Sequence, residues 1–406
     1  MGRSCGSSAA RGAASDGCAV AASGRAVTDA DERERPSRPL VVKIGSSTLT
    51  TSESSIDYDY LRTIADQIAR VRDAGWQPVI VTSAAIACGL EALGIAKRPH
   101  DMPSLQAAAS VGQSALATAY AEAFAPYGIT TSTVLLTRRD TADRRAYLHA
   151  RDTLFRLLEL GVVPIVNEND TVSVEQIRFG DNDTLAALAA CLIEADLMVI
   201  LSDIDGLYDA NPHHVPTAKL IPRVEVIDQD IMAVAGEAGT TVGSGGMITK
   251  IKAARVLMVA GIPLVVCNGR RPNVIVDVAA GEDVGTRFVA ARRPHEITPR
   301  KLWIALGDAA HGAVVVDAGA KTALIAKGSS LLPVGVAAVE GRFDADDIID
   351  IKDERGHLFA RGKALASCDE VCLAVGKTRD ELRENRLLAH LADRPLVHRD
   401  ELVVFE

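Results

Sequence analysis

Short apolar runs alternate with longer amphipathic segments from residue 39 to about residue 288. Most of the apolar runs are nearly continuous, which is typical of parallel strands buried on both faces. Three of the intervening segments have helical spacing and end in glycine shortly before a strand, as helices commonly do. The pattern predicts strands at 39–44, 78–83, 132–137, 162–167, 197–202 and 262–267, with the clearest helices at 60–75, 144–161 and 250–261.

Repeated strand–helix units predict a mainly parallel sheet covered by helices on both faces, that is, a three-layer αβα sandwich. Sheets of this kind bind ligands at the carboxyl ends of their strands. After residue 300 the pattern changes to short alternating segments between glycine and charged turns, which predicts a small mostly-β module. We therefore expect a disordered tail at 1–38, a catalytic domain at 39–291, a linker at 292–300 and the small module at 301–406.

Composition removes several classes of function. The 406 residues carry a net charge of −9, which argues against a protein held mainly on nucleic-acid phosphates. The seven cysteines form no CxxC pair, so we interpret them as reduced thiols of a cytoplasmic protein. No apolar stretch approaches the length of a membrane-spanning helix.

Two lysines lie where a phosphate could bind. Lys43 is near the end of the first predicted strand and precedes a glycine turn, and a lysine in a buried strand is costly unless it meets an anion. Lys250 lies in the first turn of the helix that follows "VGSGG", where its charge opposes the helix dipole. Both positions favour a bound polyphosphate, although a lysine at a strand end can also simply reach solvent.

Polar side chains are concentrated in two bursts, at 167–170 and 181–183, between segments that look buried. Asn182 or Asp183 could cap the following helix, but a cap accounts for one side chain and not for seven. Ser83 ends the second predicted strand before a run of tiny residues. Ser202 and Asp203 follow the fifth strand, so each polar signal lies where ligands are expected.

This set of lysines, glycine-rich turns and polar residues at strand ends favours phosphoryl transfer, in which positioning and charge neutralisation supply most of the catalysis. No Ser-His-Asp arrangement stands out, and no cysteine is paired with a histidine. A missing general base suits a carboxylate acceptor, because a carboxyl with a pKa of about 4.3 is already ionised at neutral pH. A hydroxyl acceptor would more readily require a base.

Six stretches together resemble the amino acid kinase family, and in particular its members that phosphorylate free L-glutamate. They are "VVKIGSSTL", "VTSAAIACG", "GVVPIVNENDTV", "FGDNDTLAALAA", "LSDIDGLYDANP" and "GSGGMITK", in order between residues 39 and about 290. The segment "DAGAKTALIAKGSSLLPVGVAAVEGRF" is similar to a PUA domain. The resemblance implies ATP-dependent phosphorylation of the side-chain carboxylate of L-glutamate to L-glutamyl 5-phosphate, the first step of L-proline biosynthesis.

The resemblance also implies roles for individual residues. Lys43, Lys250 and Asp203 would be catalytic, with Lys250 neutralising the transferring group. Ser83, Asp170 and Asn182 would hold glutamate, and Asp170 would face its ammonium group. Mg²⁺ would be bound mainly through the ATP phosphates, without a metal site of the protein's own. The nucleotide site would comprise Lys43, Ser202, Asp203, Ser244, Gly245, Gly246, Met247, Ile248, Thr249 and Lys250.

Three departures from the family pattern stand out. Ala84 occupies a position where the family usually has glycine, and a left-handed backbone there would strain alanine. Ser244 replaces the usual threonine and keeps the hydroxyl. The turn in "FDADDIID" lacks an expected glycine.

Two alternative functions stay open at this point. One is a related carboxylate kinase acting on N-acetylglutamate, aspartate or carbamate. The other is RNA binding through the PUA-like module, which its charge disfavours, since residues 301–406 hold 14 Lys and Arg against 18 Asp and Glu, a net of −4. The family further leads us to expect feedback inhibition by L-proline and a homo-oligomer, either a dimer or a tetramer.

Overall fold

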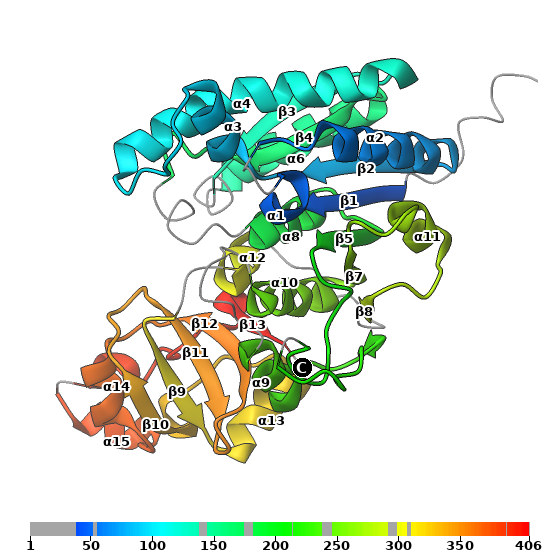
Figure 1. The fold of residues 1–406 in the computed structure, drawn as a ribbon. Helices are drawn as coiled ribbons and strands as arrows, with labels where there is room; N and C mark the ends of the chain where they lie inside the picture. The colour runs from blue at the N-terminus through cyan, green and yellow to red at the C-terminus, as the bar shows by residue number, and fades with distance from the viewer. Residues whose placement is uncertain are drawn as a thin grey trace, which may run out of the picture. The chain divides into compact units, whose positions relative to one another are not determined.

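A computed structural model describes residues 38–51, 55–137, 144–173, 182–212, 214–237, 246–290, 299–306, 310–386 and 388–405. Within these residues, the larger sheet has eight strands in the order β3-β4-β2-β1-β5-β7-β8-β6 (Figure 1). Its strands are β1 Arg38–Ile44, β2 Trp76–Val81, β3 Thr131–Leu136, β4 Val163–Glu168, β5 Leu197–Ser202, β6 Arg223–Val224, β7 Leu264–Asn268 and β8 Thr286–Phe288. The accompanying helices are α1 Ser46–Leu49, α2 Tyr58–Asp73, α3 Ala85–Ala92, α4 Met102–Phe124, η1 Ala125–Tyr127, α6 Arg144–Glu159, α8 Asn182–Leu192, α9 Gln229–Glu237, α10 Met247–Ala260, α11 Val274–Ala280 and α12 Pro299–Leu306.

The larger sheet is mainly parallel, as predicted. Only the β7–β8 pair is antiparallel among its described pairs. All six predicted strands and the three predicted helices are present. The helices α2, α6 and α10 end at glycines with positive φ, namely Gly75, Gly161 and Gly261, which confirms glycine as the stop signal.

Helices cover both faces of this sheet, which confirms the three-layer sandwich. Successive side chains of a strand point to opposite faces. Leu40, Val42 and Ile44 of β1 belong to the hydrophobic core shared with α2, α3, α4 and α11. Val41 belongs to the other core, with α6, α8 and α10. Lys43 has the same parity as Val41, so its side chain is directed toward the face that carries α8 and α10.

The C-terminal module is built on a second sheet of five strands in the order β10-β9-β11-β12-β13. Its strands are β9 Gly312–Val316, β10 Val336–Gly341, β11 Ile348–Asp353, β12 Leu358–Lys363 and β13 Leu402–Val404. Helices also contribute, namely α13 Ala318–Lys327, η2 Pro333–Gly335, α14 Cys368–Ala374, α15 Arg379–Glu384, η3 Ala389–Leu391 and η4 Arg399–Glu401. The predicted mostly-β module is confirmed.

The turn before β11 explains one departure from the family pattern. Asp346 has a φ of 76°, so an aspartate occupies the left-handed position where a glycine was expected. Its carboxylate lies 2.6 Å from Lys363 Nζ.

No helix in the described part of the chain is long and apolar enough to span a membrane. The expected tail at 1–38 lies outside the described residues, apart from Arg38, and so does most of the expected linker, since 291–298 are not described.

Candidate active site

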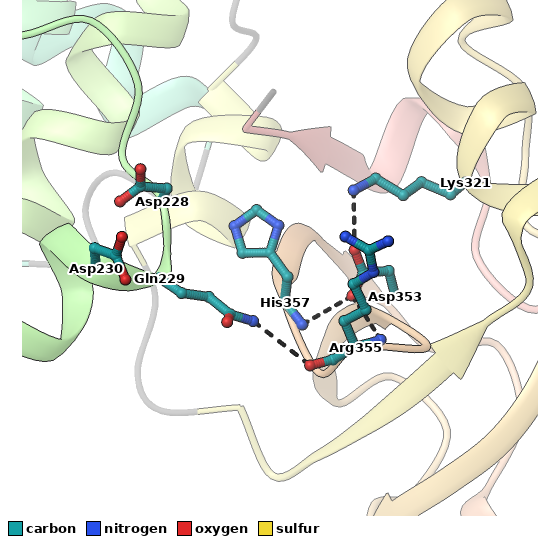
Figure 2. A pocket seen from close by; sticks show the side chains of 7 residues that line it. All are labelled: Asp228, Gln229, Asp230, Lys321, Asp353, Arg355 and His357. Atoms are coloured by element: carbon teal, nitrogen blue, oxygen red, sulfur yellow. Dashed lines mark hydrogen bonds and ion pairs between the residues drawn. The ribbon is translucent and has the colours of Figure 1, made fainter.

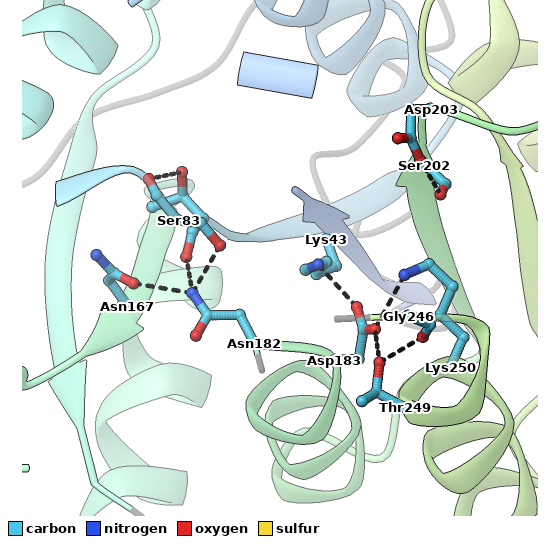
Figure 3. A network of polar contacts seen from close by, with 11 residues as sticks. Lys43, Ser83, Asn167, Asn182, Asp183, Ser202, Asp203, Gly246, Thr249 and Lys250 are labelled. Atoms are coloured by element: carbon cyan, nitrogen blue, oxygen red, sulfur yellow. Dashed lines mark hydrogen bonds and ion pairs between the residues drawn. The ribbon is translucent and has the colours of Figure 1, made fainter. Parts of the chain in front are cut away.

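Lys43 and Lys250 converge on the carboxylate of Asp183, the second residue of α8. Lys43 Nζ lies 2.7 Å from Asp183 Oδ1, and Lys250 Nζ lies 3.2 Å from Oδ2 (Figure 3). Thr249 Oγ1 donates a third contact to Oδ2 at 2.7 Å. Asp183 has no exposed surface, and both lysines are buried. The two predicted phosphate-binding lysines, from strand β1 and helix α10, are therefore brought together.

The electrostatics keep this carboxyl ionised. Burial alone would raise the pKa of Asp183, but Lys43 and Lys250 outweigh burial and hold that pKa well below its ordinary range. One carboxylate faces two ammonium groups, so the cluster keeps a net positive charge. A buried excess of positive charge attracts an anion such as a phosphate group.

The start of α10 offers further donors. Gly246 is its N-cap in an extended conformation, with no side chain capping the first turn. The first backbone N–H groups of a helix lack intrahelical partners and point toward whatever lies before the helix. Met247 and Ile248 open the helix in front of Thr249, whose hydroxyl also contacts Gly246 O at 2.8 Å. Ser244 and Gly245 lie outside the described residues.

A second polar cluster forms around Asn182, the first residue of α8. Its side-chain Nδ2 donates to Thr82 O, to Ser83 Oγ at 2.9 Å and to Asn167 Oδ1 at 3.1 Å. Figure 3 shows this cluster at the ends of β2 and β4, beside the lysine cluster. Because α8 begins with Asn182 and Asp183, one helix end anchors both clusters.

Asp170 lies in the turn just after β4. Burial raises its pKa to about 6, and Arg98 partly opposes this rise. A half-buried carboxyl with a raised pKa gains from a nearby cation, so this position suits the ammonium group of an amino acid.

Ser202 and Asp203 follow β5, on the other side of β1 from the Asn182 cluster. Ser202 is buried, Asp203 is exposed, and Ser202 Oγ donates to Asp203 Oδ1 at 3.2 Å. Across the carboxyl edge of the sheet, the predicted residues therefore follow the strand order β4, β2, β1, β5 as Asp170, Ser83, Lys43 and Ser202.

Ala84 adopts a left-handed conformation, with φ of 78° and ψ of 6°, at the N-cap of α3. A left-handed backbone is costly for a residue with a Cβ, so Ala84 is strained as expected. The helix that follows it packs closely against α4. A Cβ added to Gly89 of α3 would lie 1.7 Å from Ala108 O of α4, so the two backbones are in direct contact.

Sequence reasoning missed two residues of the site. Asp183 was placed in the second polar burst and considered as a helix cap, without a role of its own, yet it contacts both lysines. Asn167, in the first polar burst, accepts from Asn182 and donates to Gln113 Oε1 at 3.0 Å. The usable signal for Asp183 was charge balance, since two buried lysines require a buried anion.

The sequence profile of the amino acid kinase family matches residues 38–268, and that of the PUA domain matches residues 312–384. Named relatives are similar along most of the chain. The glutamate 5-kinase of Syntrophotalea carbinolica is 44% identical over 90% of this chain and 96% of its own length. That of Caldanaerobacter subterraneus is 43% identical over 90% and 98%, and that of Burkholderia mallei 46% over 91% and 98%. The chain therefore belongs to the amino acid kinase family and carries a PUA domain after its kinase domain.

Proposed function

We propose that the protein transfers the γ-phosphoryl group of ATP to the side-chain carboxylate of L-glutamate. The product would be L-glutamyl 5-phosphate, and the reaction would be the first step of L-proline biosynthesis. The observation that carries the proposal is the pairing of Lys43 and Lys250 on Asp183, next to the Ser83–Asn182 cluster. The relatives named glutamate 5-kinase support the choice of acceptor.

Glutamate would bind at the β2–β4 side of the sheet edge. Asp170 would pair with its ammonium group, because a carboxylate in a half-buried position gains from a cation. Asn182 and Ser83 would meet the rest of the amino acid, with Asn167 holding the Asn182 amide in place. These contacts orient the side-chain carboxylate toward Lys43 on the neighbouring strand β1.

ATP would bind at the β5–β7 side, with Ser202 and Asp203 beside the nucleotide and the start of α10 around its phosphates. A carboxylate oxygen of glutamate forms a bond to the γ-phosphorus while the bond to the β–γ bridging oxygen breaks and ADP leaves. Lys250 would stabilise the charge on the transferring group, and Lys43 would hold the phosphate oxygens. No base is required, because the attacking carboxylate is already ionised at neutral pH.

Mg²⁺ would be held mainly by the phosphates. The described residues contain no group of three or more His, Cys, Asp and Glu side chains placed to hold a metal ion. When bound, it would neutralise charge on the β- and γ-phosphates. Asp203, an exposed carboxylate directly after β5, could meet such an ion.

Further properties belong to the same proposal. We infer that L-proline, which shares the α-amino acid head group of glutamate, inhibits by competing at Asp170 and Asn182. We also infer a cytoplasmic homo-oligomer, with a catalytic domain at 39–291 and the PUA domain at 301–406. The net charge of −4 in the PUA domain argues against RNA as its ligand.

A substrate panel tests the proposal. The purified full chain is incubated with Mg-ATP and L-glutamate, N-acetyl-L-glutamate, L-aspartate or carbamate, and ADP release is followed together with trapping of acyl phosphate by hydroxylamine. We expect hydroxamate to form with L-glutamate, and the kcat/KM for L-glutamate to be well above that for the other acceptors. The Lys250→Ala variant serves as the inactive control. A higher kcat/KM with N-acetyl-L-glutamate or L-aspartate would refute the assignment of the acceptor.

A further inference from the structure

The helix that carries Lys250 is also in contact with the PUA domain, through Arg255. The Arg255 guanidinium lies 5.2 Å from the centroid of the Phe405 ring, just beyond the last strand of the PUA sheet. Arg255 is only 8% exposed. Five residues of α-helix, a rise of about 7.5 Å, separate it from Lys250. The active-site end of α10 and its PUA contact are therefore parts of one short rigid segment.

One face of the PUA sheet packs against the kinase core. Alternate residues of β11 divide between two cores, since Ile349 and Ile351 belong to the core of the PUA domain, whereas Ile348 belongs to the core that contains α8 and α10. Val403 of β13 lies in the latter core, and Phe405 packs against it. Phe405 N donates to Phe359 O at 2.8 Å, which holds the Phe405 backbone against β12.

Charged side chains on the same face of the sheet set the electrostatic environment of Arg255. Asp350 and Arg361 pair directly across β11 and β12, with Arg361 Nε 2.8 Å from Asp350 Oδ1. Burial, followed by the like charge of Arg361, lowers the pKa of Arg255, and Asp350 opposes this effect. An arginine buried beside a second arginine gains from the negative face of an aromatic ring. Phe405 supplies that face.

The contact between α9 and the PUA domain is looser than the Arg255 contact of α10. A cleft of about 370 Å³ lies there, with Asp228 and Asp230 on the kinase side and Lys321, Arg355 and His357 on the PUA side (Figure 2). The hydrogen bond across it, from Gln229 Nε2 to Arg355 O, is 3.5 Å long. The buried Arg255 contact is thus the better candidate for mechanical coupling.

We propose that the PUA domain acts as a positioning part of the kinase, in which the contact of Phe405 with Arg255 fixes the register of α10 and thereby places Lys250 and Thr249 on Asp183. This inference rests on the proposed function only in the measurement of kcat, which requires the proposed substrates. Arg255 and Phe405 are positioning residues, since neither touches the lysine cluster directly. The role requires a small displacement of α10 to lower turnover, and misplacement by about 1 Å can cost up to about 100-fold in rate.

The test compares Arg255→Met, Arg255→Lys, Phe405→Leu and the Arg255→Met/Phe405→Leu double variant in the full chain. Lys252→Met is the matched control, because Lys252 is an exposed lysine on the same helix. We expect Arg255→Met and Phe405→Leu each to lower kcat about tenfold with the glutamate KM changed less than about twofold. Arg255→Lys should recover most of the loss, and the double variant should be no worse than the poorer single variant.

Hydrogen exchange of the amides in 247–254, measured by mass spectrometry, gives a readout independent of activity. Exchange should quicken in Arg255→Met and Phe405→Leu, while the α2 amides keep the parental rate. The second variant keeps the test decisive if Arg255→Met fails to fold. Unchanged kcat and unchanged exchange in the folded variants would overturn the proposal, and so would additive losses in the double variant. If the parent chain phosphorylates no carboxylate, the proposed function fails while the exchange result still decides this inference.

Discussion

The replacement Asp183→Asn tests the central electrostatic feature of the site. The asparagine is nearly isosteric but carries no charge, so Lys43 and Lys250 lose the anion that lies 2.7 and 3.2 Å from their Nζ atoms. Two buried ammonium groups then face each other across a neutral amide. Their mutual repulsion, about 3 kcal/mol at a separation of about 6 Å and an effective dielectric constant of about 20, is present in the parent as well, but in the variant no attraction to a carboxylate offsets it.

The free energy of unfolding should therefore fall by about 3–5 kcal/mol at pH 7, the usual loss when a buried pair loses one partner. Because the pKa of Asp183 is depressed in the folded state, the difference between parent and variant is fully present above about pH 4 and is lost as the pH falls further.

Urea unfolding at several pH values, with and without Mg-ATP, measures these effects. The nucleotide should stabilise Asp183→Asn more than the parent chain, because its phosphates supply the missing negative charge. The matched control is Asp393→Asn, since Asp393 also contacts two cations, Arg379 and Arg383, but on the surface. The control should unfold like the parent. If Asp183→Asn is as stable as the parent and gains no extra protection from nucleotide, Asp183 is not the counter-ion of the two lysines.

Four other predictions follow from the site. Ala84→Gly should raise the free energy of unfolding by up to about 1 kcal/mol, since relief of a left-handed alanine is partly offset by the greater freedom of glycine in the unfolded chain, and a lower urea midpoint would refute the strain. The glutamate KM should rise as the pH falls through about 6, where Asp170 becomes neutral, and an Asp170→Asn variant should lose this step. Lys250→Ala should lower kcat far more than it raises either KM, and near-normal turnover would contradict its role. Millimolar L-proline should raise the glutamate KM at constant kcat, and a saturation curve unmoved by proline would exclude competition at Asp170.

The strands of the central sheet could be predicted because they are buried on both faces and therefore carry few polar side chains. The strands β6 and β8 could not, since two and three residues are too short to show any periodicity. The five-residue run of β5 hydrocarbons ends at Ser202, where the site begins. Polar residues at strand ends therefore marked the edge of the sheet where ligands bind.

Asp183 shows what local sequence cannot supply. Its place in a polar burst marked a candidate site, but a single aspartate at the start of a helix can be explained by capping, so no individual role for Asp183 followed from the sequence. Its partners come from β1 and α10, which are distant in sequence and meet only when α8 packs between them. Ala84 is the opposite case. The family usually has glycine at this position, which was enough to raise the left-handed backbone conformation found in the structure.

The strand order supports the proposed role of Lys43 as a residue that touches both substrates. The residues proposed to bind the amino acid follow β4 and β2, those proposed to bind the nucleotide lie at the end of β5, and β1 lies between β2 and β5. Its last residues are therefore the only point on this described edge that adjoins both groups. Parity directs Lys43 toward α8, whose first residue holds the amino acid cluster and whose second holds the lysines. A shift of α8 by one residue would take Asp183 away from the two lysines, so in the proposed complex the consecutive positions Asn182 and Asp183 would fix where the acceptor carboxylate meets the phosphate.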